Sequence, residues 1–271
     1  MKRSVVALAG LFAVLISVGF AQTGKSIYYD TFNGPWISPA KWLAGGPGCD
    51  QGNTLECVRE IQNGHLRMEV RNVGATDSDA GLQFTGSELH FVNPEAINSI
   101  AADVTVQRFN GVACPANNTD MTRAVIGIRG VFFNTGSGDP NDDIRDSVYF
   151  MVDTNHPKTV RVLNFVDTLG LEADIGQYPI GTALTVLNIW DKVNHRFISV
   201  VRVVGDDGPG KTVIVPYGNV SDTTPPASAD GKFLHAWSYS LNCAAVQTFS
   251  QVEAFFDNVM INAVPPNQNQ Q

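Results

Sequence analysis

The sequence predicts an all-β protein in which two antiparallel sheets pack face to face as a sandwich. Three observations lead to this fold class. Short segments rich in Val, Ile, Phe and Thr alternate apolar with polar residues, as half-buried strands do. Gly, Asn, Asp and Pro separate these segments at short intervals. No long stretch has the apolar spacing of an amphipathic helix. Many short strands joined by turns favour a sandwich or a barrel.

The predicted strands follow one another through most of the chain. Apolar and polar residues alternate in residues 66–70 and around Val104 and Val106. Further segments with strand composition are residues 123–133, 147–153, 159–166, 183–190, 195–204, 211–217, 233–241 and 252–261. Glycines flank and end the segment 171–176, so we predict a loop there.

The first 21 residues have the pattern of a secretory signal peptide. Lys2 and Arg3 precede an apolar run that ends at Phe20, and cleavage is expected after Ala21. The run is short for a membrane-spanning helix, and no later apolar run is long enough to cross a bilayer. We therefore predict a secreted or periplasmic chain without membrane insertion.

One domain is predicted for residues 22–263, because the strands that follow the loop at 221–231 are needed to complete a sheet. The polar residues 264–271 are expected to form a disordered tail. Removal of residues 1–21 takes away two positive charges and no acid, which moves the formal net charge from −8 to about −10. An acidic chain of this kind argues against nucleic acid or an anionic membrane as its partner.

Four cysteines in an exported chain predict two disulfides. Three pairings are possible. We favour Cys49–Cys57, which closes a short loop, and Cys114–Cys243, which ties distant segments together. The cysteine spacing does not match a zinc site, since there is no C-x-x-C motif and no histidine pair nearby.

Four short motifs stand near the two ends of the predicted domain. They are DTFN at 30–33, PAKW at 39–42, GHLRM at 64–68 and FFDNV at 255–259. Together they resemble the concanavalin A-like lectin and glucanase superfamily, in particular its laminarinase and lichenase type. The resemblance covers the ends of the chain, while the middle matches only as a series of strands. It implies a two-sheet antiparallel jelly-roll sandwich.

A structural calcium ion is implied by the same resemblance. In that superfamily the ion commonly joins the first and last strands, and the matching positions are the carbonyls of Thr31 and Gly64 and the carboxylate of Asp257. Calcium takes hard oxygen ligands of these kinds. Such a site would explain why one aspartate interrupts the apolar residues of the last strand. The alternative is an aspartate that faces solvent on an edge strand or caps a turn.

The catalytic motif of the glucanases, Glu-x-Asp-x-(x)-Glu, is absent. Its alternation would put three acids on one face of a middle strand. The segment at the corresponding place in the chain order, 145–153, has Asp146 and Asp153 but no glutamate. Two other acid pairs each lack one position of the motif: Glu56 and Glu60, and Glu172 and Asp174. We therefore expect no catalytic residue of the glucanase type.

An aromatic row in residues 233–241 is the candidate ligand site. Strand alternation places His235, Trp237 and Tyr239 on one face. Aromatic rings stack on the apolar faces of sugars, and polar groups fix the hydroxyls. Arg129 would supply donors from a neighbouring strand. The alternative is that these rings fill the core of the sandwich.

These features favour a secreted, lectin-like protein that is stabilised by calcium and binds a polysaccharide or another glycan without catalysis. Two alternatives remain open. One is a divergent polysaccharide hydrolase or lyase, and the other is a structural or adhesive extracellular protein that self-associates. Binding without product, release of reducing ends, and self-association without binding distinguish the three.

Overall fold

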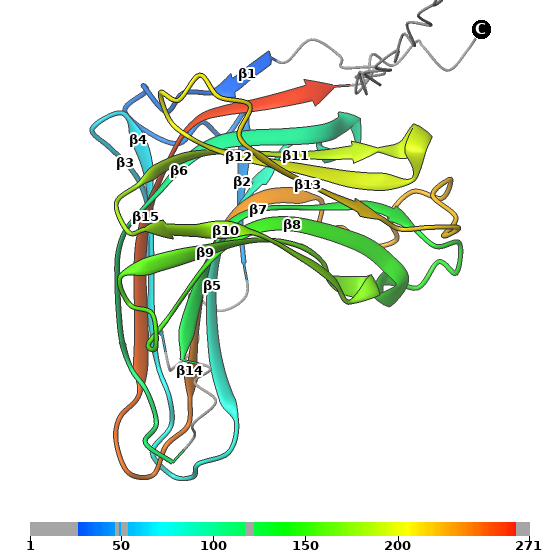
Figure 1. Cartoon of the computed structure of the whole chain (residues 1–271). Coiled ribbons are helices and arrows are strands. Elements are labelled where there is room, and N and C mark those ends of the chain that lie inside the picture. The colour runs from blue at the N-terminus through cyan, green and yellow to red at the C-terminus, as the bar shows by residue number, and fades with distance from the viewer. Residues whose placement is uncertain (1–26, 47–48, 50–53, 117–121, 264–271) are drawn as a thin grey trace, which may run out of the picture.

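The structure is a computed structural model that describes residues 27–46, 49, 54–116 and 122–263. The predicted signal peptide and C-terminal tail lie outside the described residues. Two antiparallel sheets pack face to face (Figure 1), which confirms the predicted sandwich. No helix in the described part of the chain is long and apolar enough to span a bilayer.

The two sheets take their strands from distant parts of the chain. We call the eight-stranded sheet, which contains both terminal strands, sheet A and the seven-stranded sheet B. Sheet A has the order β13 (Lys211–Pro216), β12 (Arg196–Val203), β11 (Ala183–Asp191), β6 (Ile97–Val112), β15 (Phe249–Ala263), β4 (His65–Val73) and β3 (Thr54–Gln62), and β1 (Ile27–Asp30) pairs with β15. Sheet B has the order β10 (Leu171–Pro179), β9 (Thr159–Val166), β8 (Asp143–Asp153), β7 (Arg123–Asn134), β14 (Lys232–Leu241), β5 (Leu82–Phe91) and β2 (Trp42–Gly45).

Both sheets bend strongly, and sheet B follows the inner side of the bend (Figure 1). The face of sheet B that is turned away from sheet A is therefore concave, and we call it the concave face. The core lies between the sheets. In β14, Leu234 and Ala236 are fully buried and belong to the same core cluster as residues of sheet A such as Phe256. Because strand residues alternate between faces, Trp237 and Tyr239 belong to the concave face.

Most predicted strands are confirmed, with ends that differ by a few residues. The prediction of a loop at 171–176 is wrong, because these residues belong to edge strand β10. A bulge between Asp174 and Gly176 absorbs the irregularity, and Gly176 has φ of 150°. A bulge lets a strand continue past a residue that breaks the regular register. The sequence analysis also did not identify β5, which contributes to the concave face.

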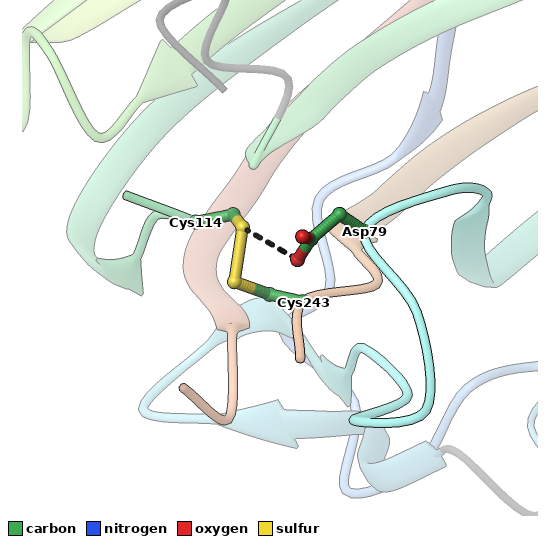
Figure 2. Close-up of side chains that lie close together, drawn as sticks. All are labelled: Asp79, Cys114 and Cys243. Carbon is green, nitrogen blue, oxygen red and sulfur yellow. Dashed lines mark hydrogen bonds between the residues drawn. A yellow bond between two sulfur atoms is a disulfide. The ribbon is translucent and has the colours of Figure 1, made fainter. Parts of the chain in front are cut away.

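The two predicted disulfides, Cys49–Cys57 and Cys114–Cys243, are both present in the structure. Figure 2 shows Asp79 beside the second disulfide, with Asp79 Oδ1 3.7 Å from Cys114 Sγ. The same carboxylate oxygen accepts a hydrogen bond from the backbone N–H of Ala244 at 2.9 Å. Metal binding by cysteine requires a thiolate. Since both sulfurs are held in the disulfide, this group of side chains is not a metal site.

Candidate functional site

Trp237 stands near the middle of the concave face and is held from several sides. Its Nε1 donates a hydrogen bond to Glu88 Oε1 at 3.0 Å. The ring of Phe84 meets it edge-on with 5.8 Å between centroids, and the guanidinium of Arg129 lies 5.3 Å from its centroid. A Cβ at Gly86, the residue opposite on β5, would lie 2.8 Å from Trp237 Cδ1. The glycine therefore leaves room for the indole ring, whose orientation is fixed before any ligand arrives.

Tyr239 extends the row toward the end of β14. Its ring lies 4.8 Å from that of Phe84, the residue opposite it on β5. The guanidinium of Arg123 is 5.3 Å from the centroid of the Tyr239 ring. Burial raises the pKa of Tyr239, so its hydroxyl stays protonated and can donate a hydrogen bond at neutral pH.

Two further aromatic side chains share the concave face, and the sequence analysis missed both. Tyr149 of β8 and Phe165 of β9 meet edge-on with 6.1 Å between their centroids. Burial, and then the charge of Glu172, raises the pKa of Tyr149 to about 12. We name the partly exposed rings on this face the concave aromatic patch, and they are Phe84, Tyr149, Phe165, Trp237 and Tyr239.

Arg129 lies in the position that the sequence predicted, on β7 beside the aromatic row. Its Nη2 donates to Asp167 Oδ2 in an ion pair, and its side chain is partly exposed. An ion pair with a carboxylate holds the planar guanidinium in one orientation. The structure thus places a fixed cationic group over the Trp237 ring.

His235 occupies the same face as Trp237 but is fully buried. Its ring lies 4.1 Å from the Trp237 ring and 6.0 Å from the Phe233 ring. Neither ring nitrogen has a hydrogen-bond partner among the described residues. Burial, and then the charge of Arg129, holds the pKa of His235 well below its ordinary value, so the ring is neutral. In this position His235 packs against Trp237, and its contact with a ligand stays a prediction.

The acidic residues considered for catalysis do not gather at one place. Glu56 and Glu60 lie on β3 in sheet A, whereas Glu172 and Asp174 lie on the edge strand of sheet B. Glu172 and Asp174 both contact Arg161, at 3.3 Å and 2.7 Å.

Two further acids of sheet B are held by other side chains. Asp146 is turned toward the core, where it accepts a hydrogen bond from Asn164 at 2.8 Å. Glu88, on the concave face, was not considered from the sequence, and its second oxygen contacts His90 Nε2 at 2.8 Å.

A second predicted site lies where the terminal strands meet (Figure 1). β1 pairs with β15 so that Asp30 is opposite Val259. Next to this pair the register of β15 shifts between Asp257 and Met260, and Asn258 adopts a φ of 48°. Asp257 accepts a hydrogen bond from the Asn258 N–H at 2.7 Å. The bulge thus gives this carboxylate a local backbone partner.

The other two predicted calcium ligands lie in neighbouring segments. Gly64, in the turn between β3 and β4, has a φ of 78°, and a Cβ there would be 3.3 Å from Asn33 Oδ1. Asn33 Nδ2 in turn donates to Thr31 Oγ1 at 3.0 Å. His65, next to Gly64, has its Nε2 3.7 Å from Asp257 Oδ2. The structure therefore brings the segments of Thr31, Gly64 and Asp257 to one corner of the sandwich.

The donor chemistry of this corner fits a hard cation. Burial, and then the negative charges of Asp103 and Asp30, raise the pKa of Asp257, although its hydrogen bond with Asn258 and the charge of His65 oppose the shift. A carboxylate in a negative surrounding gains from a bound cation. Calcium takes carboxylate and carbonyl oxygens together, so the three predicted residues carry suitable donors.

No family model matches the chain, and no curated protein matches it. Solved structures with a similar fold include a glycoside hydrolase family protein from Mycobacterium thermorestibile, with 11% identity, coverage of 85% of this chain and 97% of that chain, and a TM-score of 0.45. Another is an immunostimulatory antigen and pseudo β-1,3-glucanase of Mycobacterium tuberculosis, with 12% identity, coverage of 86% and 97%, and a TM-score of 0.43. A third is the winged bean acidic lectin complexed with methyl-α-D-galactose, with 14% identity, coverage of 88% and 99%, and a TM-score of 0.42. These likenesses are ones of fold alone.

Proposed function

We propose that this chain is an exported, non-catalytic carbohydrate-binding protein whose glycan site is the concave aromatic patch. One observation carries the proposal. Five aromatic side chains are partly exposed together on a face of sheet B that does not form the core. Rings that are left open on a concave sheet offer stacking surfaces for the apolar faces of sugar units. The arginines beside Trp237 and Tyr239 would donate hydrogen bonds to the hydroxyls.

The arrangement of carboxylates supports binding without catalysis. A retaining glycosidase needs a nucleophile and an acid/base carboxyl group about 5 Å apart, and an inverting one needs a pair at about 6.5–9.5 Å. Beside the patch, Glu88 contacts Trp237 and His90, while Glu172 and Asp174 both contact Arg161. These three carboxylates are therefore engaged in holding neighbouring side chains in place. A divergent hydrolase is the alternative that product formation would reveal.

Calcium and export belong to the same proposal. We place the ion between the Asp257 carboxylate and the carbonyls of Thr31 and Gly64, where it would join the terminal strands. It would stabilise the fold by mass action, because it binds the folded state alone. Export is supported by the two disulfides, since such bonds persist in oxidising compartments.

The test is a panel of insoluble and soluble polysaccharides presented to the protein without residues 1–21. Depletion from solution and release of reducing sugars are measured together. We expect retention on at least one polysaccharide without product, and a loss of retention of ten-fold or more for Trp237→Ala. Trp36→Ala serves as the matched control, because Trp36 is 72% exposed in the segment between β1 and β2. It should bind as the unaltered chain does.

Each other result has a definite meaning. Reducing ends that disappear when Glu88 is replaced by glutamine would support the hydrolase alternative. Self-association without retention on any polysaccharide would support the structural or adhesive alternative. Equal loss of binding in Trp36→Ala and Trp237→Ala would show that the concave aromatic patch is not the site.

A further inference from the structure

A cavity of about 500 Å³ opens at one end of the sandwich, away from the concave aromatic patch. Val131, Phe132 and Lys232 line it from sheet B, and Trp190 lines it from sheet A. The loop 222–231 between β13 and β14 covers it on another side. Lys232 alternates with Phe233 along β14 and is on the same side as Leu234, so it faces between the sheets. The cavity is therefore distinct from the glycan site proposed above.

Lys232 is an unusual member of the cavity wall, because its side chain is charged and only 4% exposed. Its Nζ donates to the carbonyls of Pro94 and Val131, each at 3.0 Å, and lies 4.7 Å from the centroid of the Phe132 ring. No carboxylate of the described residues forms a salt bridge with it. An ammonium group has three donors, so one N–H is left over after the two carbonyls. A buried charge without a partner of opposite sign is costly to the fold.

Two lysines, Lys192 and Lys232, and two acids, Glu95 and Asp222, line the cavity, so the preference for an anion rests on Lys232, which is buried without a carboxylate partner among the described residues. Lys192 stands at the rim with its Nζ 5.3 Å from the centroid of the Trp190 ring. The buried acid in the wall, Asp222, already contacts the Tyr217 hydroxyl at 2.6 Å and His195 Nδ1 at 3.1 Å. The Asp222 carboxylate therefore already has two polar partners. Burial lowers the pKa of Lys232 to about 8, opposed only by the charge of Glu95, so most of the ammonium is still protonated below that pH.

Trp190 provides an aromatic part of the cavity wall. Its Nε1 donates to the Tyr217 hydroxyl at 3.0 Å, and its ring stacks on Phe133 with 5.3 Å between centroids. These contacts fix the plane of the indole. A volume of about 500 Å³ lies within the range of small-molecule sites.

We propose that this cavity binds a small organic carboxylate, whose anionic group meets Lys232 and whose ring lies against Trp190. Acidic sugars and aromatic acids share this chemistry. The proposal does not depend on the glycan site, because the two sites use different faces of sheet B.

Isothermal titration of the full chain at pH 6.5 tests the proposal with D-glucuronate and benzoate as probes and D-glucose as the neutral control. We expect one or both carboxylates to bind and glucose not to bind. Glucuronate alone would identify an acidic sugar as the ligand class, and benzoate alone an aromatic acid. The variant Lys232→Met keeps the aliphatic stem, and we expect it to weaken binding at least ten-fold while retention on polysaccharide is unchanged.

A second variant guards against a fold defect in Lys232→Met. Ala229 is an exposed residue of the cavity rim, so Ala229→Trp would narrow the entrance and leave Lys232 in place. It should weaken carboxylate binding without a change in melting temperature. Absence of binding by both carboxylates, equal binding of glucose, or unchanged affinity in both variants would overturn the proposal.

Discussion

The indole Nε1 of Trp237 donates a 3.0 Å hydrogen bond to the carboxylate of Glu88. The two residues lie on the neighbouring strands β14 and β5 of sheet B. Glu88 is 7% exposed, so the hydrogen bond forms in a largely dry environment. Its other oxygen contacts His90. The Glu88 carboxylate thus fixes the orientation of the Trp237 ring in the concave aromatic patch. A residue of β5 therefore positions a side chain of the proposed binding surface.

Glu88→Ala should weaken glycan retention and lower stability together. It would leave the Trp237 N–H without its acceptor, and an unsatisfied buried donor costs about 1–3 kcal/mol. We expect a five- to ten-fold loss of affinity, because the ring would no longer be held in one orientation. Glu88→Gln keeps an acceptor oxygen and should retain most of the binding. Depletion assays and thermal melting measure the two effects, and equal affinities for both variants would contradict this account.

Calcium removal should lower the melting temperature if the ion joins the terminal strands as proposed. Asp257→Asn should show the melting temperature of the calcium-free chain whether or not calcium is present, because the substitution removes the charged carboxylate that would bind the ion. Asp142→Asn is the matched control, since Asp142 is an exposed acid in the loop between β7 and β8 of sheet B. It should keep the full response to calcium. A melting temperature that chelation leaves unchanged would remove the metal from the proposal.

The concave site could be predicted in part, because strand alternation is a local property of the sequence. In residues 233–241 the alternation placed Trp237 and Tyr239 on one face, and the structure keeps them there. Phe84 was missed because β5 was not identified as a strand, and Gly86 interrupts the row of large side chains that β5 places on this face. A glycine is needed at position 86 because the Trp237 ring of the neighbouring strand occupies the space of a side chain there. A single sequence does not show which strands are neighbours.

The cavity near Lys232 could not be predicted, because a non-local contact shapes its wall. The Asp143 carboxylate accepts hydrogen bonds from the backbone N–H groups of Ala227 and Ser228, at 2.8 Å and 2.7 Å. These contacts hold the loop 222–231 in place. Burial alone would raise the pKa of Asp143, but the hydrogen bonds outweigh it and hold the pKa below its usual value. Nothing in the local composition of either segment indicates this pairing.

The two disulfides should differ in their contribution to stability. Cys114–Cys243 spans 129 positions and Cys49–Cys57 spans 8. Restriction of the unfolded chain predicts losses of about 5 kcal/mol and about 2–3 kcal/mol when each pair is replaced by alanines. Denaturant unfolding of the two double variants measures the difference. An equal loss in both would mean that the folded-state surroundings of the sulfurs, rather than loop length, determine their effect.

The core contains a polar cluster that should make stability depend on pH. Asp146 is fully buried between the sheets, and its Oδ1 accepts a hydrogen bond from Asn164 Nδ2 at 2.8 Å. Asn164 Nδ2 also donates to Ser199 Oγ at 2.9 Å. Burial raises the pKa of Asp146 to about 7, although the neighbouring side-chain amides of Asn188 and Asn164 reduce the shift. The side chain is therefore protonated in the folded state at mildly acidic pH.

The sign of the effect follows from the two protonation states. The folded pKa of Asp146 lies above the ordinary aspartate value of 3.8, so between these values the folded protein holds a proton that the unfolded chain has lost. Its contribution to stability is full below about pH 4 and is lost as the pH rises through about 7. Asp146→Asn mimics the protonated acid. We expect it to match the unaltered chain near pH 4 and to exceed it by a few kcal/mol above pH 7. Denaturant unfolding across this pH range, with Asp142→Asn as the exposed control, measures the difference, and a constant offset between the two chains would refute a buried protonated Asp146.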